Sequence, residues 1–210
     1  MTRFKVGDYA GVGCFVDSCD ACEDCKIDEV QFCPGYVVSI NCKKKGKRVG
    51  GNPNTWTQGG YSKTHVVHEK FAFKFPETMD LTSAAPIMCG GITMYSPLKH
   101  WGCLNGKKMT VGIIGVGGLG TYGIKLAKAM GHDVVAISSS NAKEAMARSK
   151  GADFFVASKD PESMLAGKGK CNLILNTVSA DHDLNTYLPL LARDGTIVQL
   201  GLCFSPHNIS

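Results

Sequence analysis

Four of the ten cysteines in this 210-residue chain lie within one short stretch. Two residues separate Cys19 from Cys22 and Cys22 from Cys25, and Cys33 follows after seven more. Thiolates three positions apart in a tight turn can point to a common centre, and a fourth thiolate from a short loop completes a tetrahedron. The spacing therefore predicts a structural zinc ion that holds this acidic loop together.

An iron–sulfur cluster is the alternative for these cysteines. Three cysteines at this spacing, with a later Cys33-Pro34, also occur among iron–sulfur ligands. The bacterial ferredoxin pattern has three residues before its last cysteine, whereas here there are seven and no second run follows. We therefore favour zinc. Because four thiolates leave no open coordination position, we expect this metal to stabilise the fold and not to catalyse.

A glycine-rich turn is the second chemical motif. A short apolar run from Val111 to Ile114 predicts a buried strand, and a Gly-x-Gly-x-x-Gly turn leads from it into a helical pattern. In that context the first glycine permits the turn, the second lets a pyrophosphate approach the helix N-terminus, and the third lets helix and strand pack closely. The predicted cofactor contacts on the turn are Gly115, Gly117, Gly118, Leu119 and Gly120.

The next predicted strand ends in Ser138 and Ser139. An NAD site would place an acidic residue near this point to hold the ribose 2′-hydroxyl, and none is present. Small hydroxyls together with Lys143 suit a 2′-phosphate, so the sequence predicts NADP as the cofactor. Asn141 and Glu144 also form a fair helix-capping pair, and both interpretations can hold together.

The remaining patterns define the elements that must position these residues. Further strands are predicted at 154–156, 173–175 and 196–200, and helices from Asp160-Pro161 and over 181–192. This alternation predicts an α/β fold with a parallel, doubly wound sheet. Residues 1–80 instead predict a β-rich domain, with strand-like stretches at 6–13, 35–38 and 59–67. On a strand His65 and His68 would face opposite sides, so we do not expect them to chelate one metal.

Composition and charge exclude several classes of protein. Hydrophobic residues make up 44% and charged residues 20% of the chain, which argues against disorder. The net charge of +5 is concentrated in the run from Lys43 to Arg48 and does not indicate nucleic-acid binding. No apolar stretch is long enough for a membrane helix, and the N-terminus has no signal-peptide core, so we expect no membrane partner and a cytoplasmic location.

Taken together, the motifs resemble the zinc-dependent medium-chain alcohol dehydrogenases, within them the cinnamyl-alcohol dehydrogenase branch of NADP-dependent aldehyde reductases. Besides the cysteine stretch and the glycine turn, the resemblance rests on Phe4-Lys-Val-Gly-Asp, Thr57-Gln-Gly-Gly-Tyr, Ala84-Ala-Pro-Ile-Met-Cys, Gly91-Ile-Thr-Met-Tyr-Ser-Pro-Leu and Leu175-Asn-Thr-Val. It implies a GroES-like catalytic domain over 1–80, an interdomain helical segment over 81–104 and a Rossmann domain over 105–210, the two domains incomplete.

The resemblance also implies roles for single residues. Cys89, which spacing alone would leave as an inert buried thiol, matches a ligand of the catalytic zinc. Thr93 matches a nicotinamide contact, and Val178 lies in the stretch that passes the nicotinamide. Ser138, Ser139 and Lys143 match the 2′-phosphate group, and Cys19, Cys22, Cys25 and Cys33 match the structural zinc ligands. The implied reaction is reversible hydride transfer between NADP(H) and a primary, aromatic or allylic alcohol and its aldehyde, in a homodimer for intact members.

The chain also departs from the family pattern. Family members carry an N-terminal segment with the first catalytic cysteine and a Gly-His-Glu motif, and a C-terminal part with a sixth strand. None of these is found here, and His65, His68 and His100 are not at ligand positions. We therefore expect the middle of a longer enzyme. The alternative is a non-catalytic, zinc-stabilised NADP-binding protein.

Overall fold

The computed structural model describes residues 3–43, 56–61, 63–203, 205–206 and 209. It divides into two compact units, Met1–Cys89 and Gly90–Ser210. The division falls inside the predicted interdomain segment, so that the helical residues of this segment are shared between the units. Most of the basic run, at 44–48, lies outside the described residues.

In its described residues, the first unit contains three small antiparallel pairs of strands. Helical turns connect them and are at most four residues long. The strand pairs are β1 (Ala10–Val12) with β6 (Ala72–Lys74), β2 (Phe15–Asp17) with β3 (Val37–Val38), and β4 (Ile40–Lys43) with β5 (Trp56–Gln58). The turns are α1 (Glu23–Lys26), η1 (Val30–Phe32), η2 (Glu69–Phe71), α2 (Leu81–Ala84) and η3 (Ala85–Met88).

The strand predicted within 59–67 is wrong, because the described residues from 61 to 67 form no strand. The chain instead runs into η2, where the His68 side chain accepts a hydrogen bond from the backbone N–H of Lys70 at 3.2 Å. Such a local side-chain acceptor gives the backbone an alternative to a sheet ladder. His68 therefore caps a turn, while the His65 side chain is exposed.

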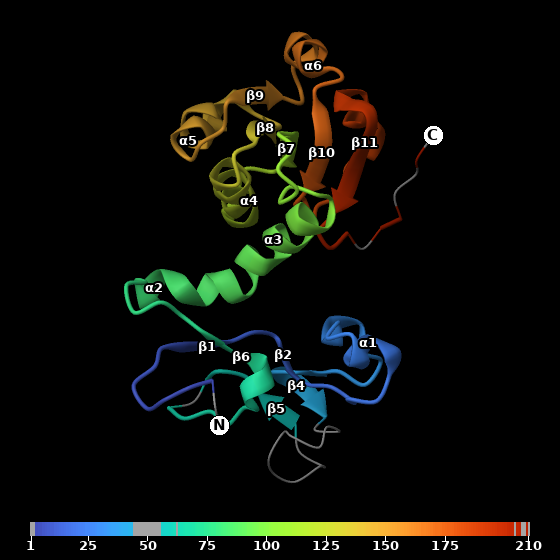
Figure 1. The fold of residues 1–210 in the computed structure, drawn as a ribbon. Helices are drawn as coiled ribbons and strands as arrows, with labels where there is room; N and C mark the ends of the chain where they lie inside the picture. Colours follow the sequence, from blue (N-terminus) through green and yellow to red (C-terminus); the bar gives the residue numbers. More distant parts are fainter. Residues whose placement is uncertain (1–2, 44–55, 62, 204, 207–208, 210) are drawn as a thin grey trace. The chain divides into compact units, whose positions relative to one another are not determined.

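The second unit contains the predicted parallel sheet, which is confirmed (Figure 1). All four neighbouring pairs in the order β11-β10-β7-β8-β9 are parallel. The strands are β7 (Thr110–Ile114), β8 (Asp133–Ser138), β9 (Phe154–Ala157), β10 (Cys171–Asn176) and β11 (Leu191–Gln199). Because β7 leads to β8 on one side while β10 lies on the other, the strand order reverses between β7 and β10.

Apolar side chains alternate between two cores on the two faces of this sheet. Val111 and Ile113 belong to one core, whereas Ile114 belongs to the other, as strand geometry requires. The first face is covered by α3 (Gly90–His100), α4 (Gly118–Ala129) and α5 (Glu144–Ser149), and the second by α6 (Pro161–Gly167) and η6 (Leu188–Leu190). The short turn η5 (Leu184–Thr186) precedes η6. The sheet is thus doubly wound. None of the described helices is long and apolar enough to cross a membrane.

The helix predicted over 181–192 is wrong. Only the short turns η5 and η6 form there, and β11 already begins at Leu191 beside Cys171. Pro189 within η6 has no N–H to extend a helix. β11 contains an irregularity at Asp194, where this residue adopts a positive φ of 60° and the register with β10 shifts.

The predicted cap at Asn141 is shifted by one residue. The Ser140 hydroxyl accepts the hydrogen bond from the backbone N–H of Ala142 at 3.2 Å. The reason is that a short 3-10 turn, η4 (Asn141–Lys143), precedes α5, so that the capping position lies at Ser140.

Ile174 tests the packing of the second unit, because its side chain is fully buried in the interior strand β10. We expect Ile174→Ala to lower the free energy of unfolding by about 2–5 kcal/mol, from lost apolar burial and the cavity left behind. The matched control is Leu165→Ala on α6, where 71% of the residue is exposed and a change within about 0.5 kcal/mol is expected. Urea unfolding followed by circular dichroism measures both, and equal losses would contradict the assigned core.

Candidate metal and dinucleotide sites

The four cysteines of the predicted zinc site converge in the structure. The sulfur atoms of Cys19, Cys22, Cys25 and Cys33 all lie within 4.8 Å of one another, and those of Cys19 and Cys25 are 3.9 Å apart. Zinc–sulfur bonds of about 2.3 Å in a tetrahedron place sulfurs about 3.8 Å apart. Among the described residues no other group of three or more potential ligands comes together. This donor set fits a structural zinc ion.

Backbone N–H groups point at these sulfurs. Ala21 and Cys22 each donate to Cys19 Sγ at 3.4 Å, and Gly35 donates to Cys33 Sγ at 3.3 Å. The bonds from Ala21 and Cys22 lower the pKa of Cys19 to about 6. Since zinc binds the thiolate and not the thiol, these donors favour the metal-binding form of Cys19.

The cysteine lobe also depends on close backbone packing and on one lysine. A Cβ at Gly35 would lie 3.2 Å from Cys19 Cβ, so glycine lets the two ends of the lobe approach. Asp20 and Asp28 adopt positive φ angles of 58° and 61°. Lys70 Nζ reaches a carboxylate oxygen of each, at 3.6 and 3.5 Å, and so ties both turns of the lobe to η2.

Two other buried cysteines lie outside any metal cluster. Burial raises the pKa of Cys103 to about 11 and that of Cys171 to about 12. Both therefore remain protonated at neutral pH and pack as apolar groups.

The glycine turn sits at the carboxyl end of β7, beside the point where the strand order reverses. Gly115 has a φ of +91°, and a Cβ there would lie 2.7 Å from Thr177 Oγ1. A Cβ at Gly120 would lie 1.8 Å from the carbonyl oxygen of Gly115. Beside Gly117 and Gly118, by contrast, a Cβ would meet nothing within 4 Å. Open space thus remains at the N-terminus of α4, where a dinucleotide phosphate binds in this kind of fold.

The predicted 2′-phosphate residues lie at the end of β8. Ser138 is buried as the last residue of the strand, and Ser139 is exposed. Lys143 Nζ donates a hydrogen bond to the carbonyl oxygen of Val116 at 3.1 Å. The structure therefore brings Lys143 to the glycine turn, 27 positions away in the sequence.

The residues assigned to the nicotinamide end have different surroundings. A Cβ at Gly115 would lie 3.1 Å from Val178 Cγ2, so Val178 adjoins the glycine turn. Thr93 is half-buried in α3. Cys89 is exposed, ends the first unit and belongs to no group of three potential metal ligands in the described part of the chain.

Thr177 is a site residue that sequence analysis missed. Its hydroxyl donates to the carbonyl oxygen of Ile114 at 2.8 Å and to that of Gly115 at 3.2 Å. The available clue was its position two residues after the predicted strand 173–175, because strands beside the reversal point end near the ligand.

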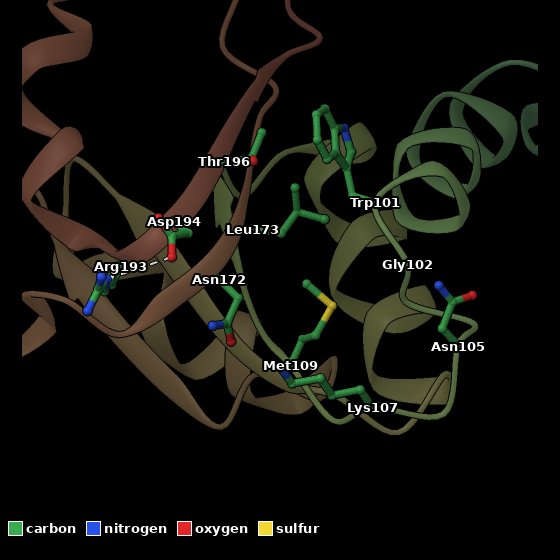
Figure 2. A pocket seen from close by; sticks show the side chains of 10 residues that line it. All are labelled: Trp101, Gly102, Asn105, Lys107, Met109, Asn172, Leu173, Arg193, Asp194 and Thr196. Atoms are coloured by element: carbon green, nitrogen blue, oxygen red, sulfur yellow. Dashed lines mark ion pairs between the residues drawn. The ribbon is translucent and has the colours of Figure 1, made fainter.

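A pocket of about 510 Å³ lies at the opposite, amino-terminal end of the sheet (Figure 2). Its wall includes Trp101, Lys107 and Met109 from the segment that links α3 to β7. Arg193 and Asp194 of β11, whose charged groups are 3.8 Å apart, complete the rim. The pocket is thus separated from the glycine turn by the length of the strands.

Comparisons with known proteins confirm the family resemblance and the fold class. Residues 118–210 match the family described as zinc-binding dehydrogenase. Over its whole length the chain is 46% identical to the NADP-dependent alcohol dehydrogenase C 1 of Mycolicibacterium smegmatis, of which it covers 58%. It is 42% identical to cinnamyl alcohol dehydrogenase 5 of Arabidopsis thaliana, over 98% of this chain and 56% of that one.

Solved structures give the same result. The chain superposes on a cinnamyl alcohol dehydrogenase from Sorghum bicolor with a TM-score of 0.89 at 39% identity, covering 100% of this chain and 58% of that one. For CAD from Helicobacter pylori complexed with NADP(H) the TM-score is 0.84 at 36% identity, with 97% and 55% covered. The chain therefore spans less than two thirds of the length of these relatives.

Replacing one cysteine tests the metal assignment. We expect Cys33→Ser to reduce bound zinc from about one ion per chain to near zero and to lower the melting temperature, because a buried ligand is lost. Cys14→Ser, at an exposed cysteine outside the cluster, is the matched control and keeps its zinc. Elemental analysis after dialysis measures the metal. Iron with inorganic sulfide in the wild-type chain would contradict the zinc assignment.

Proposed function

We propose that this chain, whose residues 118–210 match the family described as zinc-binding dehydrogenase, is part of an NADP(H)-linked oxidoreductase. Its reaction would interconvert a primary alcohol, aromatic or allylic, and the corresponding aldehyde. The observation that carries the proposal is the open glycine turn at the reversal point of the sheet, with Lys143 held beside it. Named relatives that are NADP-dependent alcohol dehydrogenases support it.

The charges around the turn favour NADP over NAD. Ser138 and Ser139 end β8, where an NAD site would place a carboxylate. The acidic residue that follows in the sequence is Glu144, and its carboxylate accepts a hydrogen bond from Arg148 Nε at 2.8 Å. The Lys143 ammonium is thus the charged group directed toward the turn, and it attracts a phosphate.

The contribution of this chain to the reaction is to bind and orient the cofactor. In the reducing direction, bound NADPH would supply the hydride for the aldehyde carbon and would be left as NADP⁺, and a proton would complete the alcohol. The glycine turn and the end of β8 would hold the pyrophosphate and the adenosine 2′-phosphate. We propose Val178 and Thr93 as the contacts of the nicotinamide.

The described residues do not fit a complete catalytic zinc site. A catalytic zinc needs three protein ligands, and Cys89 is joined by no such set in the part of the chain that the structure describes. We propose Cys89 as the one ligand that the described residues of this chain contribute to the catalytic zinc. The same observation favours a second candidate function, a zinc-stabilised NADP-binding protein without catalysis.

Cofactor preference is tested by replacing Lys143. We expect the chain to bind NADPH more tightly than NADH. Lys143→Met should lower the affinity for NADPH by about 10- to 100-fold, because a charge-assisted phosphate contact is lost. NADH lacks the 2′-phosphate, so its binding should weaken by less than about tenfold, and only because the hold of Lys143 on the Val116 carbonyl is lost. Titration of nicotinamide fluorescence measures both cofactors.

Lys125→Met on the exposed face of α4 is the matched control, and both affinities should stay unchanged. If Lys143→Met weakens NADH and NADPH equally, Lys143 does not recognise the 2′-phosphate. If the wild-type chain binds neither dinucleotide, the proposed function is wrong.

Turnover by the 210-residue chain separates the two candidate functions. With zinc, NADPH and cinnamaldehyde supplied, we expect cofactor binding without NADPH oxidation, both in the wild type and in Cys89→Ala, because the described residues offer no three-ligand site. Absorbance at the nicotinamide band measures the oxidation. Turnover that disappears in Cys89→Ala would show instead that a catalytic metal site forms in this chain.

A further inference from the structure

The segment Asn176–Val178 lies against the glycine turn. It begins with the last residue of β10, Asn176, which is the ladder partner of Ile114 at the carboxyl end of the sheet. Thr177 donates its backbone N–H to the carbonyl oxygen of Ile114 at 3.0 Å. Its hydroxyl donates to the same oxygen at 2.8 Å and to that of Gly115 at 3.2 Å. Thr177 therefore contacts the turn through both its backbone and its side chain.

The carbonyl groups of three consecutive residues are held in this way. Thr177 holds those of Ile114 and Gly115, and Lys143 holds that of Val116. Because a trans peptide unit is planar, the carbonyl of one residue and the N–H of the next point in opposite directions. Fixing the carbonyls of Gly115 and Val116 therefore also fixes the N–H groups of Val116 and Gly117.

Thr177 is itself held in place by a buried amide. Asn176 is fully buried, and its Oδ1 accepts the backbone N–H of Val178 at 3.2 Å. Its Nδ2 lies 2.5 Å from Gln199 Oε1 and 2.7 Å from His182 Nε2, both of which accept from it. A buried polar group with this many partners has one favourable orientation, since any other would leave hydrogen bonds unmade. The backbone at Thr177 is fixed as a result.

There is also a steric match between Thr177 and the turn. A Cβ at Gly115 would come within 2.7 Å of Thr177 Oγ1, so the hydroxyl occupies the space that the glycine leaves. The glycine permits both the positive φ of the turn and the approach of the threonine. This contact joins residues 62 positions apart.

We propose that Thr177 is a positioning residue for the dinucleotide pyrophosphate. Its hydroxyl sets the direction of the peptide unit between Gly115 and Val116, and with it the path of the turn into Gly117 and Gly118, beside which the open space lies. The inference rests on the proposed function, because it assigns Thr177 to that same cofactor site. It predicts that the hydroxyl affects ligands that contain a pyrophosphate and spares those that lack one.

The test compares two ligands on one variant. Thr177→Val removes the hydroxyl and keeps the shape of the side chain, and Thr177→Ser restores the hydroxyl. NADPH contains the pyrophosphate, whereas adenosine 2′-monophosphate has the adenosine and 2′-phosphate without it. We expect Thr177→Val to lower the affinity for NADPH about three- to tenfold and to change the affinity for adenosine 2′-monophosphate less than about twofold. Thr177→Ser should restore NADPH binding.

Thr110→Val is the matched control, because Thr110 begins the same strand β7 at the end away from the turn. It should leave both affinities unchanged, and thermal melting measures the stability of every variant. Equal NADPH affinity in Thr177→Val and the wild type would overturn the positioning role. So would an equal loss for both ligands, since a general disturbance of the fold would then explain it. A wild-type chain that binds adenosine 2′-monophosphate but not NADPH overturns the proposed function instead.

Discussion

The second unit depends on one close contact between a helix and the strand before it. Gly120 in the first turn of α4 lies so near the Gly115 carbonyl that an added Cβ would be 1.8 Å from that oxygen. This approach lets α4 start directly above the end of β7 and lets Ile113 pack under Gly123. With α4 fixed in this way, its N-terminus faces the open space beside Gly117 and Gly118, which is where the proposed phosphate site lies.

The two units are stabilised by different physical means. In the second unit, alternate side chains of the sheet fill two apolar cores, and burial of this apolar surface drives folding. The first unit has strand pairs of two to four residues, and its cysteine lobe contains only helical turns of three or four. A four-thiolate metal can supply there the energy that a small apolar core cannot.

The proposed cofactor site draws on three separate stretches of the second unit. The glycine turn follows β7. Ser138 ends β8, and Ser139 and Lys143 follow it. Asn176 ends β10, and Thr177 and Val178 follow it. Parallel strands place their carboxyl ends at one edge of the sheet, so residues far apart in the sequence meet there. Lys143 and Thr177 then hold the turn from two sides, while the pocket beside Trp101 lies at the other edge.

Local patterns in the sequence were sufficient for the features that depend on neighbouring residues. The four cysteines converge as their spacing predicts, β7 and α4 flank the glycine turn, and Asp160 caps α6, with Pro161 in its first turn. In each case the physical cause lies within a few residues: ligand spacing, a buried strand with a tight turn, or a side chain that caps its own helix.

Other features were decided by contacts between distant residues. Residues 181–192 have a composition compatible with a helix. However, Leu191 pairs with Cys171, so the strand begins at Leu191 and not at the predicted residue 196. The hydroxyl of Thr177 can hold the glycine turn only because the fold brings it to the carbonyl of Gly115, and the Lys143 ammonium only because the fold brings it to the carbonyl of Val116. Such contacts depend on which strands become neighbours in the sheet, and pairing is set by burial over the whole domain. The sequence alone therefore determined the motifs, whereas the tertiary structure decided which residues hold them in place.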